Sequence, residues 1–89
     1  MKDRNTEQQL RYLGEVRACL HRAGFETTQI EDSQIPVERN GAPLCRITGK
    51  GSVFYRREDV NTPQAGDALL CIEGIAARTM EYMTVMETA

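Results

Sequence analysis

The hydrophobic and polar side chains of residues 34–57 alternate with the two-residue period of a half-buried β-strand. Two short loops that end in glycine, Arg39-Asn40-Gly41 and Gly49-Lys50-Gly51, divide this segment into three strand-like runs. The pattern therefore predicts an antiparallel meander.

The register of this meander depends on the length of its loops. We expect two three-residue turns, each closed by a glycine in the left-handed conformation. The facing pairs are then Glu38 with Ala42, Thr48 with Ser52, Ile35 with Cys45, and Ile47 with Val53. One face of the sheet carries Ile35, Val37, Cys45, Ile47, Val53 and Tyr55, as a sheet with one buried side requires. The other face carries Pro36, Glu38, Leu44, Arg46, Phe54 and Arg56.

A two-residue Asn40-Gly41 turn is the alternative for the first loop, and it is the stronger local signal. This shorter turn would bring Arg39, Leu44 and Arg46 next to Ile35 and Val37, and so place two charged side chains among the apolar ones. We therefore favour the longer loop.

Residues 26–31 give a weaker strand signal, carried by β-branched residues among polar ones. Glu31-Asp32-Ser33 is the predicted turn into the meander. Pro36 and Pro43 cannot donate a hydrogen bond to a strand ladder, so each needs an edge, a bulge or an outward-pointing nitrogen. We expect an irregular first hairpin.

Helical periodicity precedes the strands. Thr6, followed three residues later by Gln9, is a capping-box signature that predicts a helix over residues 7–23. Gly24 fits the left-handed position after its end, and Phe25 can then fold back on Leu20. The apolar half of this helix comprises Leu10, Tyr12, Leu13, Val16, Cys19, Leu20 and Ala23.

A second helix is predicted from Thr62-Pro63 to about residue 86, because a capping hydroxyl followed by proline favours a helix start. This helix would be about 36 Å long, whereas four strands span only about 15–20 Å. Its apolar face comprises Ala65, Ala68, Leu69, Ile72, Ile75, Ala76, Met80, Tyr82, Met83 and Met86. Its far end should therefore extend past the sheet and be covered by the first helix lying antiparallel, or by a second copy or partner.

These elements predict a single small α+β domain over residues 1–89. Two helices would pack on one side of an antiparallel meander of three or four strands, in the order α-β-β-β-β-α. This is a two-layer architecture.

Charge is unevenly distributed although the net charge is only −2. Residues 34–57 hold five basic side chains against Glu38, and residues 58–89 hold six acidic ones against Arg78. The candidate surface for a partner or a nucleic acid is Arg46, Lys50, Phe54, Arg56 and Arg57. It would stack a base or dock an acidic segment, unless Arg46 and Phe54 form a cation–π pair that only stabilises the sheet.

Reactive residue types do not form a recognisable catalytic pattern. Cys19, Cys45 and Cys71 are scattered without a Cys-x-x-Cys pair, and all three project towards predicted apolar faces. The chain lacks a phosphate-loop motif and a nucleophile elbow. We expect no enzymatic activity, no metal and no cofactor. The longest apolar run has only five residues, so we also expect no membrane span. We expect the protein to lie in a reducing cytoplasm.

Residues 35–47 (IPVERNGAPLCRI) and 49–55 (GKGSVFY) resemble uncharacterised small proteins of Gram-positive gut anaerobes, some of them carried on mobile elements. The similarity runs from about Gly24 to the C-terminus and implies no particular activity, cofactor or catalytic residue. Related chains continue beyond Thr88-Ala89, which is consistent with this chain being the N-terminal module of a longer protein.

We expect a small intracellular, non-catalytic interaction or regulatory module that self-associates. The candidate self-association residues are Leu70, Gly74, Ala77, Met83 and Met86. The alternative is a nucleic-acid-binding accessory protein of a mobile element, whose affinity would fall steeply with salt.

Overall fold

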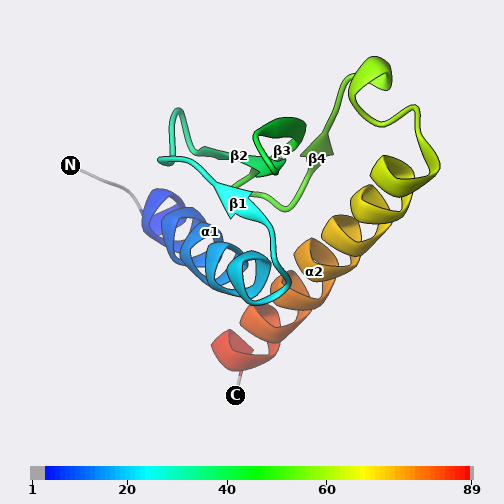
Figure 1. The fold of residues 1–89 in the computed structure, drawn as a ribbon. Helices are drawn as coiled ribbons and strands as arrows, with labels where there is room; N and C mark the ends of the chain where they lie inside the picture. The colour runs from blue at the N-terminus through cyan, green and yellow to red at the C-terminus, as the bar shows by residue number, and fades with distance from the viewer. Residues whose placement is uncertain (1–3, 89) are drawn as a thin grey trace.

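The computed structural model describes the backbone of residues 4–88 and the side chains of residues 6–87. Its elements are α1 (Arg4–Arg22), β1 (Glu26–Thr27), β2 (Gln34–Arg39), β3 (Ala42–Thr48), β4 (Val53–Phe54), the 3-10 turn η1 (Arg57–Asp59) and α2 (Pro63–Thr88). The strands form one antiparallel sheet in the order β1-β2-β3-β4, with both helices on the same side of it (Figure 1). The predicted two-layer α+β arrangement is confirmed.

The C-terminal end of α1 is formed as the sequence predicts. Gly24 has a φ of 91°. The amide of Gly24 donates to the carbonyl of His21 at 3.1 Å, and the amide of Phe25 donates to the carbonyl of Leu20 at 2.9 Å. This is the hydrogen-bond pattern of a Schellman motif, and it folds Phe25 back into the core. The predicted start was wrong, because α1 already begins at Arg4 and no glycine or proline near Thr6 prevents the earlier turn.

The register of the first hairpin differs from the predicted one. Its loop is the two-residue Asn40-Gly41 turn, in which both residues have positive φ, and Arg39 pairs with Ala42. Ile35 therefore does not face Cys45. The observed pairs further along this hairpin are Val37 with Cys45, Pro36 with Arg46, and Ile35 with Ile47.

A β-bulge explains why the shorter loop still gives one buried face. The register shifts between Val37 and Glu38, because β3 has an extra residue, Leu44, at this point. The bulge lies next to Pro43, where the ladder cannot use an amide donor. Ile35, Val37, Cys45 and Ile47 all remain buried, as predicted, but Leu44, which was predicted for the exposed outer face, is buried too and belongs to the core.

The second hairpin has the predicted three-residue loop. The amide of Thr48 donates to the carbonyl of Ser52 at 2.9 Å, and Ile47 pairs with Val53. β4 then ends at Phe54. Tyr55 consequently leaves the buried face and is 52% exposed, contrary to the prediction.

β1 is shorter than the predicted strand over residues 26–31. The chain turns at Asp32 and Ser33, which both have positive φ, and Glu31 forms an isolated bridge with Gln34. Only Glu26 and Thr27 remain to pair with β2.

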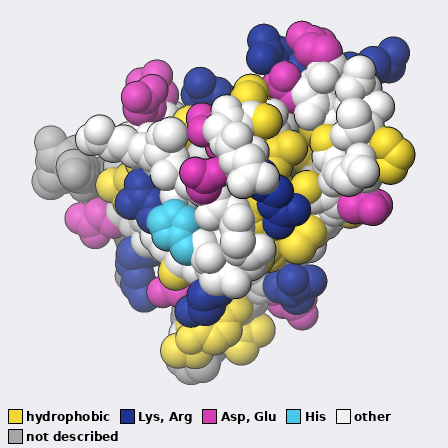
Figure 2. Space-filling view, viewed as in Figure 1, with side chains coloured by type: hydrophobic (Ala, Val, Ile, Leu, Met, Phe, Trp, Pro, Cys, Tyr) yellow, Lys and Arg dark blue, Asp and Glu magenta, His cyan; other side chains and the backbone are white. Residues whose placement is uncertain are grey.

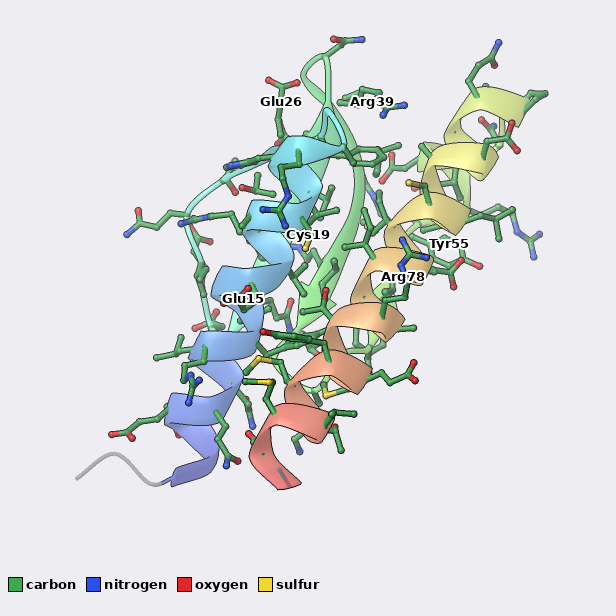
Figure 3. The ribbon with its side chains drawn as sticks, turned by 90° about the horizontal axis from the view of Figure 1, so that it is seen from below. Glu15, Cys19, Glu26, Arg39, Tyr55 and Arg78 are labelled. Carbon is green, nitrogen blue, oxygen red and sulfur yellow. The ribbon has the colours of Figure 1, made fainter. Side chains whose placement is uncertain are left out.

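The two helices pack side by side in opposite directions, so α1 is the cover that the sequence pattern required (Figure 3). The start of α2 is capped as predicted, because the Thr62 hydroxyl accepts a hydrogen bond from the amide of Ala65 at 3.1 Å. The Tyr12 hydroxyl of α1 donates to the carbonyl of Ala76 in α2 at 2.8 Å. Met83 is buried with only 7% of its surface exposed, whereas Tyr82 and Met86 stay more than half exposed.

Candidate functional site

The C-terminal part of α2 exposes a row of large apolar side chains. Tyr82, Val85 and Met86 are spaced three and four residues apart, which places them on one face of the helix, and we call them the α2 stripe. Their exposed fractions are 56%, 58% and 57%. Figure 2 shows hydrophobic side chains gathered at the lower end of the molecule, where Figure 1 places the end of α2.

The five predicted self-association residues are distributed differently from the expectation. Leu70 is 69% exposed, and Ala77 and Met86 are also exposed. Met83 belongs to the domain's own core and is not a surface residue. The guanidinium of Arg78 lies over Gly74. A side-chain carbon at position 74 would be only 3.0 Å from Arg78 Nη1. The helical pattern could have indicated Tyr82 and Val85, which the prediction left out of this surface.

A groove between α1 and α2 adjoins the α2 stripe. Its volume is about 650 Å³, and we call it the α1–α2 groove. Figure 3 shows Glu15 and Cys19 of α1 and Arg78 of α2 along it. Its lining residues are Glu15, Cys19, Arg22 and Ala23 from α1, and Cys71, Ile75, Arg78, Thr79 and Tyr82 from α2.

The chemistry of the α1–α2 groove is that of a surface for apolar and acidic groups. Arg22 and Arg78 contribute two guanidinium groups against the single carboxylate of Glu15. Arg22 Nη2 lies 3.3 Å from Cys19 Sγ, and the Thr79 hydroxyl lies 4.0 Å from the same sulfur. Within residues 4–88 no group of three or more His, Cys, Asp or Glu side chains could hold a metal ion. The groove is therefore suited to receive side chains, with two cations to attract a carboxylate.

A second concave surface lies on the outer side of the sheet. It has a volume of about 520 Å³, and we call it the sheet hollow. Arg46 and Phe54 face each other across β3 and β4, as predicted, and Phe54 is 60% exposed. Arg56 lines the same hollow but precedes η1 and does not pair with Leu44.

The charge of Arg56 is satisfied within the chain. Its Nε and Nη2 donate to the two carboxylate oxygens of Asp59 at 2.9 and 3.3 Å, and its Nε is 3.9 Å from Glu58. These interactions raise the pKa of Arg56, with the hydrogen bond to Asp59 as the main cause. An exposed guanidinium that is already paired with carboxylates offers little net charge to a phosphate backbone.

Two of the five residues predicted for a nucleic-acid surface lie away from the sheet hollow. Lys50 lies at the tip of the second hairpin, in a separate hollow with Gln9 and Tyr12 of α1 and Met80 and Glu87 of α2. Arg57 belongs to η1 and does not line the sheet hollow. The fold therefore gathers only Arg46, Phe54 and Arg56 at one surface.

Cys45 is not an activated nucleophile. Burial, with a smaller contribution from the nearby carboxylate of Glu73, raises the pKa of its thiol to about 12. The thiol stays protonated at neutral pH, when nucleophilic chemistry needs the thiolate. This cysteine acts as a small apolar residue of the core.

The tip of the first hairpin is held against Phe25 and β1 by contacts that sequence reasoning missed. The guanidinium of Arg39 lies 4.1 Å from the centre of the Phe25 ring, and the amide of Gly41 donates to a carboxylate oxygen of Glu26 at 3.4 Å. His21 Nε2 lies 2.7 Å from the hydroxyl of Thr27, so it links α1 to β1. These contacts stabilise the fold and leave His21 away from the α1–α2 groove.

Comparison with models of protein families, with curated proteins and with solved structures finds no match for this chain. Within residues 4–88, no helix combines the length and the apolar character needed to cross a membrane.

Proposed function

We propose that this protein is a non-catalytic protein-interaction module that self-associates through its helical layer. The observation that carries the proposal is the α2 stripe, in which Tyr82 and Met86 are more than half exposed beside the α1–α2 groove. Neighbouring apolar side chains exposed on one helix face are typical of an interaction surface. Methionine and tyrosine suit such a surface, because both supply large contact areas.

The second feature that supports the proposal is the chemistry of the groove beside the stripe. The α1–α2 groove combines an apolar floor, which includes the buried side chain of Ile75, with two guanidinium groups. This composition is suited to holding a protein segment.

Sedimentation equilibrium across a range of protein concentrations tests self-association directly. We expect a concentration-dependent dimer for the unmodified chain. Tyr82→Lys and Met86→Lys should each weaken it by at least tenfold, because a charge replaces apolar area that the contact would bury.

Phe54→Lys is the matched control, since it places the same charge at an equally exposed apolar residue in the sheet hollow. This variant should dimerise like the unmodified chain. An unmodified chain that remains monomeric at hundreds of micromolar would refute the proposal. Equal losses in all three variants would show that the contact is not specific to the helical layer.

A further inference from the structure

The α2 stripe and the α1–α2 groove lie next to each other on one helix. The groove takes its α2 residues from positions 71–82, and the stripe occupies positions 82–86 of the same helix. In a dimer with a two-fold axis, the stripe of each copy can contact the groove of the other copy, which gives two identical contacts. The two copies then form a closed dimer.

Resting on the self-association proposed above, we propose that the second copy binds about a two-fold axis with the two α2 helices antiparallel. Tyr82 and Met86 of each copy enter the α1–α2 groove of the other copy. Glu81 of each copy then lies opposite Arg78 of the other.

The charges of α2 support this register. Arg78 is the single basic residue of the helix, whose acidic residues are Asp67, Glu73, Glu81 and Glu87. The ion pairs between described residues both involve Arg56, and neither involves Arg78 or Glu81. The groove carries two arginines against one carboxylate, so it attracts the acidic edge of a second α2.

The spacing along the helix supports it as well. With the axis level with residues 79 and 80, Glu81 comes level with Arg78 of the second copy. At about 1.5 Å per residue, Met86 comes level with Glu73, in the turn that also holds Gly74 and Ile75, beside the apolar floor of the groove. A parallel arrangement would instead place Arg78 opposite Arg78 and Glu81 opposite Glu81, and like charges at these distances repel.

Charge exchange tests the pairing. Arg78→Glu and Glu81→Arg should each weaken the dimer about tenfold, because each creates two like-charge contacts across the axis. The double variant Arg78→Glu/Glu81→Arg should restore the dissociation constant to within about threefold of the unmodified chain. Circular dichroism of each variant checks that the domain is folded.

Cysteine cross-linking tests the direction of the helices. In a Cys19→Ala/Cys71→Ser background, a 1:1 mixture of Gly74→Cys and Val85→Cys chains should form a disulfide-linked dimer that contains one of each. Neither variant should cross-link with itself. Residues 74 and 85 lie opposite each other only in the antiparallel register, and buried Cys45 is not expected to compete.

The outcomes separate this inference from the proposed function. A dimer that ignores the charge variants, or in which each cysteine variant cross-links with itself, overturns the antiparallel pairing and leaves self-association standing. A chain that stays monomeric overturns both. Restoration by the double variant together with mixed cross-linking supports both.

Discussion

The outer side of the sheet and the outer side of the helical layer both expose large apolar residues, but they differ in how their charges are arranged. In the sheet hollow, Arg56 is held by Asp59 and Glu58 of the same chain. In the helical layer, Arg78 takes no part in the ion pairs of the described residues, so it is available to a carboxylate from another chain. Exposed apolar area alone therefore does not identify an interface here, and the charges beside it distinguish the two surfaces.

The largest effect should be the difference in stability between substitutions at a buried and at an exposed methionine of α2. Met83→Ala should lower the free energy of unfolding by about 2–5 kcal/mol, because it leaves a cavity under α1. Met86→Ala should change it by less than about 0.5 kcal/mol, since Met86 is exposed in the single chain. Urea unfolding followed by circular dichroism at low protein concentration measures both. Similar losses in the two variants would contradict the assignment of Met86 to the surface.

High pH should destabilise the domain through two buried groups, the Tyr12 hydroxyl and the Cys45 thiol. Burial raises the pKa of Tyr12 from 10.0 to about 12, so the unfolded chain releases this proton at a lower pH than the folded chain does. The stability linked to Tyr12 is complete below pH 10 and is lost as the pH rises towards 12, by up to about 1.4 kcal/mol per pH unit. Cys45 acts in the same direction from pH 9 upwards. Unfolding free energies measured from pH 8 to 11.5 should therefore fall.

Tyr12→Phe isolates the contribution of the phenol. The variant loses the hydrogen bond to Ala76 and should be less stable at neutral pH. Its free energy of unfolding should nevertheless fall less steeply above pH 10 than that of the unmodified chain. Identical slopes would show that the Tyr12 hydroxyl does not titrate differently in the folded and unfolded states.

The smallest effect should be on nucleic-acid binding, measured by the fluorescence anisotropy of labelled DNA and RNA. We expect no binding by the unmodified chain at micromolar concentration in low salt, because the acidic neighbours of Arg56 offset its charge. Glu58→Gln/Asp59→Asn should introduce weak binding that disappears as salt increases, since it leaves Arg46 and Arg56 unopposed beside Phe54. Strong salt-dependent binding by the unmodified chain, lost in Arg46→Ala, would instead support the nucleic-acid alternative.

The sequence predicted those features that depend on local chemistry. The glycine after α1 and the Thr62-Pro63 cap each act within a few residues, so they could be recognised without the rest of the fold. The loop of the second hairpin and the pairs nearest to it were also correct, because a regular ladder follows directly from that loop.

The first hairpin was wrong for a reason that involves both of its strands. Asn40-Gly41 favours the two-residue turn, whereas a regular ladder that buries Ile35 and Val37 with the apolar residues of the next strand requires a longer loop. The bulge at Leu44 satisfies both requirements, but its presence depends on the pairing of β2 with β3. Alternation along one strand could not reveal it.

The candidate site was only partly predictable. The exposed end of α2 follows from helical periodicity, and the apolar face of this helix predicted either an antiparallel α1 or a partner as its cover. The α1–α2 groove requires Arg22 and Arg78, which are 56 positions apart in the sequence, to lie beside the same floor. Only the packing of the two helices establishes that arrangement.

The two outermost strands of the sheet, β1 and β4, are each only two residues long. A long exposed edge is a template on which other chains can add strands, and this is a common route to amyloid-like aggregates. Here an incoming chain would find few backbone groups in register at either edge. Crowded copies of this protein should therefore resist fibril formation through their sheets.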